Sequence, residues 1–209
     1  MATPKSQRIG ILIIAVVMVV GTIGSFAVMV LATRNQQDQS NSQQAAYEEY
    51  QADIEAQNAQ LSEQYYPVFS EYSDLPKVYS RDSVTKLVTK DLRVGDGETV
   101  ADETLFVAYY IGWNSDGTVF DQSIDNGALK APFPINGLAT TSVIEGWQEG
   151  LVGMKLGGVR LLEIPSDKAY GEKGSGDKIP PNEPLKFVVM AVEQPEAVPV
   201  PPLLLQGAL

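Results

Sequence analysis

The sequence predicts an α+β fold in which an antiparallel sheet wraps around one short helix, preceded by a transmembrane helix and a helical stalk. Three observations support this prediction. Residues 9–32 form an uncharged apolar run, residues 33–85 change from a polar stretch to helical periodicity, and residues 86–194 hold several short apolar runs separated by turn residues. The 209 residues suffice for one ordinary domain with appendages.

Residues 9–32 are apolar and uncharged, and they are long enough to cross a hydrocarbon core of about 30 Å. Lys5 and Arg8 precede this run, and only Arg34 follows it closely. By the positive-inside rule, we expect a single-pass membrane protein with residues 1–8 in the cytoplasm and the C-terminal domain outside it. The alternative is a cleaved signal peptide, whose apolar region is typically only about 7–15 residues long.

Residues 33–85 predict a polar tether followed by a stalk helix. The tether is the low-complexity run NQQDQSNSQQ, and the helix after it has one apolar stripe. The stripe consists of Tyr47, Tyr50, Ile54 and Leu61. It would allow a short coiled coil and a weak homodimer. We favour a stalk helix that packs on its own domain or frays, because the stripe lasts only about two heptads and Gln57 interrupts it.

Residues 86–194 predict the folded domain, because period-two and apolar runs alternate there with turns such as NSDG. The expected strands are TKLVTKDLRVGDG, ETLFVAYYIGW, TVFDQS, GGVRLLEIP and LKFVVMAVE. Only residues 143–152 are typical of a helix. Residues 195–209 form a Pro-rich tail that we expect to be disordered.

The composition excludes several classes of chemistry. The chain has no Cys and no His, which excludes Cys nucleophiles, disulfides, thiolate metal sites and His general bases. The formal net charge of -11 argues against a nucleic-acid partner, which would need clustered Lys and Arg. Any reaction must therefore depend on carboxylates, hydroxyls, lysines or binding alone.

Trp147 lies between glycines in SVIEGWQEGLVGMKLGG, a combination that indicates a surface shaped around a ligand. Together with YIGW, DGTVFDQS and IPSDKAYGEKGSGDKIPPNEPLKFVV, the segment VIEGWQEGL resembles the FKBP family of macrolide-binding peptidyl-prolyl isomerases. The resemblance extends from Leu87 to Glu193 and covers neither the anchor nor the stalk.

The resemblance implies a curved sheet of about five strands, a short helix across its concave face and a pocket between the two. It implies that Trp147 forms the pocket floor and that the Ile144 amide binds a substrate carbonyl. The implied catalytic residues are Asp121, Tyr110, Phe120, Trp147, Tyr170 and Phe187. The implied substrate-binding residues are Phe133, Val143, Ile144 and Ile179.

Together with the expected membrane span, the resemblance implies a membrane-tethered prolyl isomerase that helps exported or surface proteins to fold, with Xaa-Pro-containing polypeptides as clients. The implied reaction breaks no covalent bond, so we expect no metal and no cofactor. Two departures from the family keep an alternative open, a binding or chaperone module with weak or no catalysis. The segment DQSIDNGALKAPF has no Arg where many family members pair one with the pocket aspartate, and Lys130 is its sole basic residue. The loop EKGSGDKI, residues 172–179, has Ser175 and Lys178 where macrolide-sensitive members tend to carry a ring or an aliphatic side chain, so this loop is more polar than theirs. In a third hypothesis, the stalk carries the main function by dimerising through its apolar stripe, and the folded domain serves only as a docking module.

Overall fold

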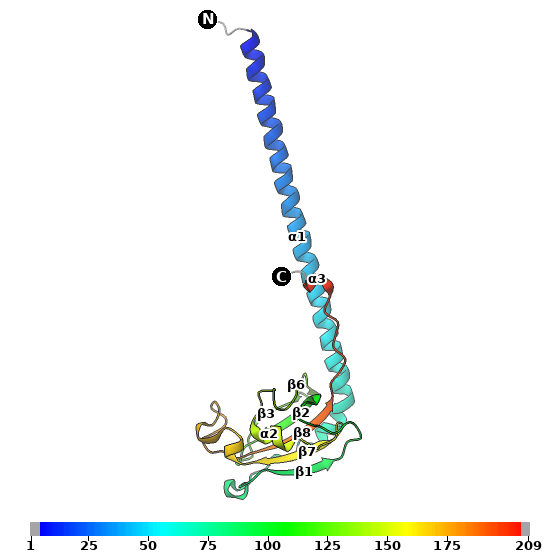
Figure 1. Ribbon diagram of the computed structural model, residues 1–209, viewed down its shortest axis with the longest axis vertical. Coiled ribbons are helices and arrows are strands. Elements are labelled where there is room, and N and C mark those ends of the chain that lie inside the picture. Colours follow the sequence, from blue (N-terminus) through cyan, green and yellow to red (C-terminus); the bar gives the residue numbers. More distant parts are fainter. Residues whose placement is uncertain (1–4, 206–209) are drawn as a thin grey trace. The chain divides into compact units, whose positions relative to one another are not determined.

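The structure, a computed structural model, describes residues 5–205, with the side chains of residues 29, 30, 34 and 36–205 (Figure 1). The chain divides into two compact units. One consists of Met1–Asp53 and Val198–Leu209, and the other of Ile54–Ala197. The long helix α1 (Lys5–Phe69) contributes residues to both units, and the whole sheet lies in the second.

The predicted membrane span, residues 9–32, falls almost entirely on positions whose side chains lie outside the described set. Within the described set, no helix combines the length and the apolar character that crossing a bilayer requires. In the tail, Pro202–Leu205 forms the single helical turn α3 (Figure 1).

The main sheet is antiparallel and has the strand order β1-β7-β8-β2-β3, with β6 also paired to β2. Its strands are β1 (Val88–Arg93), β2 (Leu105–Trp113), β3 (Val119–Gln122), β6 (Phe133–Asn136), β7 (Val159–Ile164) and β8 (Leu185–Glu193). Because β8 occupies one edge of β2, β3 and β6 share the other edge, β3 along residues 111–113 and β6 along residues 105–108. Because β3 and β6 lie end to end along the same edge of β2, the six strands form a sheet that is five strands wide. Of these six strands, β6 is the one not expected from the sequence.

The loop between β3 and β6 holds a small hairpin of β4 (Ile124–Asp125) and β5 (Ala128–Leu129). Asn126 and Gly127 form its turn with positive φ angles of 47° and 82°, a conformation that Asn and Gly adopt readily. Four short 3₁₀ helices complete the second unit: η1 (Ser70–Tyr72), η2 (Arg81–Ser83), η3 (Ser166–Lys168) and η4 (Gly171–Lys173).

Both faces of the central strands are buried. In β2, Phe106 and Ala108 face the short helix α2 (Glu145–Gly150), whereas Val107 and Tyr109 belong to the core on the opposite face. The side chains of β8 alternate between the same two cores. This double burial explains why β2 and β8 are almost continuously apolar in sequence.

The end of α1 covers the face of the sheet opposite α2. Phe69 is fully buried there, and the ring of Tyr65 lies 6.1 Å from that of Tyr109. Ser62 Oγ accepts a 2.7 Å hydrogen bond from the Leu129 N–H of the β4–β5 hairpin. The second unit therefore begins at Ile54, well before residue 86.

The helix residues that pack here follow the apolar stripe, and none of the four stripe residues belongs to the core on this face. Packing of the stripe itself on the domain stays a prediction. Gln57, which interrupts the stripe, has a structural partner: its Nε2 donates a 2.7 Å hydrogen bond to the carbonyl of Glu196. The side chain thereby ties the chain after β8 to the helix. Homodimerisation through the stalk stays a prediction.

Candidate functional site

A pocket of about 420 Å³ lies between α2 and the sheet. All of the predicted site residues except Ile179 line it, and Ser142 lines it in addition. The predicted residues that it brings together are Tyr110, Phe120, Asp121, Phe133, Val143, Ile144, Trp147, Tyr170 and Phe187. Sequence reasoning missed Ser142, which directly precedes Val143 and carried no signal of its own.

Aromatic rings from four strands and α2 shape the pocket. Tyr110 lies on β2, Phe120 on β3, Phe133 on β6 and Phe187 on β8. The Trp147 ring is nearly perpendicular to the rings of Tyr110 and Phe187, with centroid separations of 5.4 and 5.5 Å. Such edge-to-face packing holds each ring in place and leaves a rigid apolar wall.

Close packing of α2 on the sheet places Trp147 at the pocket. A Cβ on Gly146 would lie 2.3 Å from Cγ2 of Ile164 on β7, so only glycine allows this approach. The Trp147 side chain is 4% exposed, and its Nε1 has no hydrogen-bond partner within the described residues. The Trp147 ring thus lines the pocket while it packs against the rings of Tyr110 and Phe187.

Arg160 on β7 fixes the end of α2, a role that the sequence analysis did not assign. Its Nη1 donates to the carbonyls of Gly150 and Val152 at 2.9 and 3.0 Å, and its Nε donates to Asp91 on β1 at 2.6 Å. The available signal was a basic residue inside the apolar strand GGVRLLEIP. A buried arginine needs such partners, and these partners connect helix and sheet.

Asp121 is the carboxylate at the pocket edge. Its Oδ2 accepts a 2.5 Å hydrogen bond from the Tyr110 hydroxyl, and its Oδ1 accepts one from the Gln122 N–H at 2.8 Å. Burial of Tyr110 and this hydrogen bond raise the pKa of its hydroxyl well above the ordinary value. Burial and the charge of Asp121 also raise the pKa of Tyr170.

Lys130, the sole basic residue of DQSIDNGALKAPF, does not reach Asp121. Lys130 Nζ instead donates to the carbonyl of Gln122 at 3.0 Å. A tyrosine hydroxyl thus orients the carboxylate in place of a cation. Among the described side chains, no cluster of three or more metal-ligating residues occurs.

Ile179, the remaining predicted residue, lines an adjoining pocket of about 380 Å³. Phe120, Asp121 and Tyr170 line both pockets, so the two lie side by side with these residues between them. Ser175, Gly176 and Lys178 complete the second one. Lys178 Nζ donates a 2.9 Å hydrogen bond to the Phe120 carbonyl, which fixes the polar loop against β3.

A protein-family model described as FKBP-type peptidyl-prolyl cis-trans isomerase matches residues 96–192. The FK506-binding protein of Neisseria meningitidis serogroup A is 42% identical over 103 residues, which are 49% of this chain and 91% of that protein. The FKBP-type 22 kDa peptidyl-prolyl cis-trans isomerase of Escherichia coli K12 is 42% identical over 99 residues, 47% of this chain and 45% of that protein. The solved structure of AtFKBP13 is 33% identical, covers 52% of this chain and 93% of that one, and has a TM-score of 0.45.

Proposed function

Since this chain belongs to the FKBP-type peptidyl-prolyl cis-trans isomerase family, we propose that it is a membrane-tethered isomerase that rotates Xaa-Pro bonds of exported or surface proteins in its aromatic pocket. The observation that carries the proposal is the single pocket in which Trp147, Phe187, Tyr110 and Asp121 meet. Its volume of about 420 Å³ suits a proline ring with its neighbouring backbone.

The pocket lowers the barrier by changing the surroundings of the amide. Rotation about an Xaa-Pro bond meets a barrier of about 18–20 kcal/mol, because amide resonance is lost at the twisted geometry. The planar amide is more dipolar than the twisted one, so water stabilises the planar form preferentially. Transfer into a pocket lined by Trp147, Phe120 and Phe187 removes that stabilisation and favours rotation.

Polar groups at the rim orient the substrate. The Ile144 N–H precedes α2 and donates to no acceptor in the described part of the chain, so it is available for a substrate carbonyl. The Tyr110 hydroxyl is engaged with Asp121, whereas that of Tyr170 donates to no described acceptor. Tyr170 is therefore the group that we assign to the rotating carbonyl.

The membrane tether rests on the sequence. Residues 9–32 are uncharged and apolar, and the basic residues Lys5 and Arg8 precede them. We assign the N-terminus to the cytoplasm and the pocket to the opposite side of the membrane. The test compares alkaline extraction of membranes that contain the whole chain with extraction after deletion of residues 9–32. Release of both proteins into the supernatant would refute the tether.

The second candidate is a binding module with weak or no catalysis. It is favoured by the absence of an Arg beside Asp121 and by the polar residues Ser175 and Lys178 in the adjoining pocket. Such a module would bind a Pro-containing peptide without accelerating its isomerisation.

The deciding experiment follows cis-to-trans relaxation of an Xaa-Pro peptide with the whole chain in detergent micelles. The uncatalysed step takes tens of seconds, about 10–100 s, so acceleration is easily measured. Trp147→Leu and Asp121→Ala test the pocket, and Val94→Ala, a change at an exposed position, is the control. Acceleration that falls in the two pocket variants supports the isomerase. Peptide binding by a folded parent without acceleration would establish the binding module instead.

A further inference from the structure

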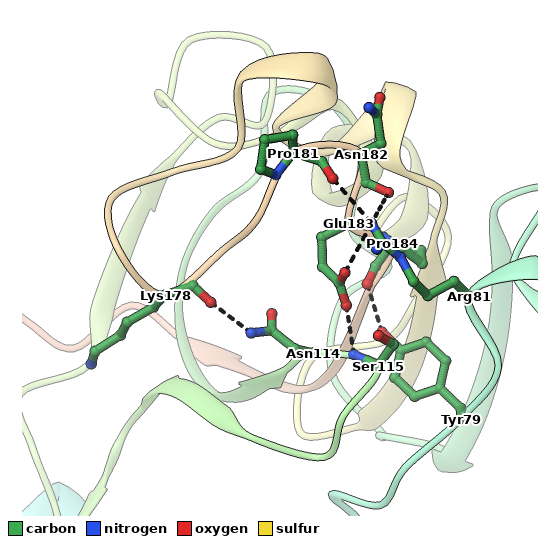
Figure 2. A network of polar contacts seen from close by, with 9 residues as sticks. All are labelled: Tyr79, Arg81, Asn114, Ser115, Lys178, Pro181, Asn182, Glu183 and Pro184. Carbon is green, nitrogen blue, oxygen red and sulfur yellow. Dashed lines mark hydrogen bonds and ion pairs between the residues drawn. The ribbon is translucent and has the colours of Figure 1, made fainter.

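Two segments far apart in sequence are joined by a network of polar contacts (Figure 2). The first, residues 77–84, is called the strap here; it connects the end of α1 to β1 and lies outside the family match at residues 96–192. The second, residues 171–184, is called the flap; it carries Ser175, Lys178 and Ile179 over the adjoining pocket. Both segments belong to the second compact unit.

Arg81 of the strap binds the end of the flap through three oxygens. Its Nη2 donates to the carbonyls of Pro181 and Asn182 at 3.0 and 2.8 Å and lies 3.2 Å from Oε2 of Glu183 (Figure 2). The Glu183 side chain is only 4% exposed, whereas that of Arg81 is 48% exposed. A buried carboxylate requires a compensating charge, and within the described chain Arg81 is the cation paired with it.

Glu183 also connects the flap to the turn between β2 and β3. Its Oε1 accepts a 2.7 Å hydrogen bond from the Ser115 N–H. The neighbouring Asn114 donates from Nδ2 to the carbonyl of Lys178 at 2.6 Å, inside the flap (Figure 2). The flap is thus held at its middle by the turn and at its end by the turn and the strap together.

Tyr79 provides a second link between strap and flap. Its hydroxyl donates to the Pro184 carbonyl at 2.6 Å, and its N–H donates to the Ser115 carbonyl at 2.9 Å. Lys186 Nζ lies 4.6 Å from the centroid of the Tyr79 ring, which adds a cation–π contact. The strap therefore contacts both the flap and the turn that supports it.

We propose that the strap is a positioning element for the flap, and that Arg81 acts as a positioning residue which sets how tightly the adjoining pocket holds the residues flanking the proline. This inference rests on the proposed isomerase function. Without Arg81 the buried Glu183 carboxylate is unpaired, so the end of the flap moves toward water and Ile179 loses its place over the pocket. Substrate binding then weakens, while the rings around Trp147 keep their arrangement.

The test measures kcat and KM of the whole chain for Xaa-Pro peptides that carry residues on both sides of the proline. Arg81→Ala is compared with Lys77→Ala as the matched control. Lys77→Ala also removes one positive charge from the strap, but the Lys77 side chain is exposed and has no hydrogen bond or ion pair among the described residues. We expect Arg81→Ala to raise KM about three- to ten-fold with kcat within about two-fold of the parent, because it removes one partner of a partly buried pair. Lys77→Ala is expected to behave as the parent.

A readout independent of activity is amide hydrogen exchange in the flap. The Ser175 N–H donates to the Ile179 carbonyl at 2.9 Å, and the Ile179 N–H donates to the Ser175 carbonyl at 3.1 Å. We expect the amide hydrogens of both residues to exchange with solvent faster in Arg81→Ala than in Lys77→Ala. The double variant Arg81→Ala/Glu183→Gln leaves no unpaired charge, so its KM should lie closer to that of the parent. Tyr79→Phe removes only the second link and should raise KM in the same direction.

Equal KM values and equal exchange rates in Arg81→Ala and Lys77→Ala would overturn the proposal. So would a fall in kcat of Arg81→Ala with KM unchanged, since that would place the effect on the chemical step. If the parent lacks isomerase activity, the proposed function fails, and the exchange comparison still decides whether the strap holds the flap.

Discussion

The Tyr110 hydroxyl donates a 2.5 Å hydrogen bond to Oδ2 of Asp121, and it thereby connects the central strand β2 to β3 at the edge of the pocket. The two residues lie on neighbouring antiparallel strands and share one face of the sheet. Burial and this hydrogen bond both raise the pKa of Tyr110, so its hydroxyl stays a donor to a higher pH than that of an ordinary tyrosine. The carboxylate is therefore oriented without any basic side chain.

Removal of this hydrogen bond is expected to lower activity without loss of the fold. We expect Tyr110→Phe and Asp121→Asn each to reduce kcat/KM about ten-fold, which corresponds to about 1.4 kcal/mol of transition-state stabilisation. The peptide relaxation assay measures this, with near-UV circular dichroism as the check on folding. If Tyr110→Phe keeps the full kcat/KM while Asp121→Asn loses it, the hydrogen bond does not serve to orient the carboxylate.

Gly112 on β2 lies directly beneath two rings of the pocket. A Cβ at this position would lie 2.6 Å from Cζ of Phe120 and 2.6 Å from Cε1 of Phe187. Gly112→Ala therefore displaces both rings toward the pocket, and we expect a destabilisation of about 1–3 kcal/mol and a clear increase in KM. Urea unfolding and the relaxation assay measure the two effects. An unchanged KM would show that the rings can move away from the pocket.

The strands and the short helix of the domain could be predicted from local sequence signals, whereas the set of pocket residues was implied by the resemblance to the FKBP family. The strand runs, the NSDG turn and the Gly-flanked Trp147 specify their own elements, and the sheet then brings the aromatic residues together. β6 was not predicted because the run APFPIN is short and contains Pro134, and proline is uncommon within strands. Because β6 pairs only with β2, it is an edge strand, where a proline is tolerated. Ile179 was expected in the main pocket, and its position in the adjoining one depends on how the flap is held.

The second cover of the sheet could not be located from local patterns. Near-continuous apolar runs such as those of β2 and β8 are typical of strands buried on both faces, but nothing in them identifies the end of α1 as the cover. Likewise, the contacts of Arg81 with Glu183, of Arg160 with Asp91 and of Gln57 with Glu196 join residues distant in sequence and depend on the assembled fold. A pattern of single residues cannot specify such contacts.

The end of α1 is expected to contribute strongly to the stability of the second unit. Phe69 is fully buried against Tyr109, so Phe69→Ala should cost about 3–5 kcal/mol. Ser62→Ala leaves the Leu129 N–H without its acceptor and should cost about 1–3 kcal/mol. Chemical unfolding of the whole chain measures both, with the exposed Glu55→Ala as control within about 0.5 kcal/mol. A Phe69→Ala variant as stable as Glu55→Ala would mean that this helix end does not help to hold the sheet.

Buried tyrosines are expected to make the fold sensitive to alkali. Burial raises the pKa of Tyr109 to about 12, and burial also raises the pKa of Tyr110 and of Tyr79. An unfolded tyrosine ionises near pH 10, so above about pH 10 the unfolded chain binds fewer protons than the folded one. The free energy of unfolding therefore has its full value below about pH 10 and falls as the pH rises toward 12.

Tyr109→Phe provides the test, because its ring stays buried while its hydroxyl has no described hydrogen-bond partner to lose. We expect the variant to have about the same urea midpoint as the parent at pH 7 and a higher one at pH 11, since one group that favours the unfolded state in alkali is gone. Parent and variant midpoints that fall in parallel from pH 9 to pH 11 would contradict the assignment. In that case the ionisation that unfolds the protein in alkali belongs to other groups.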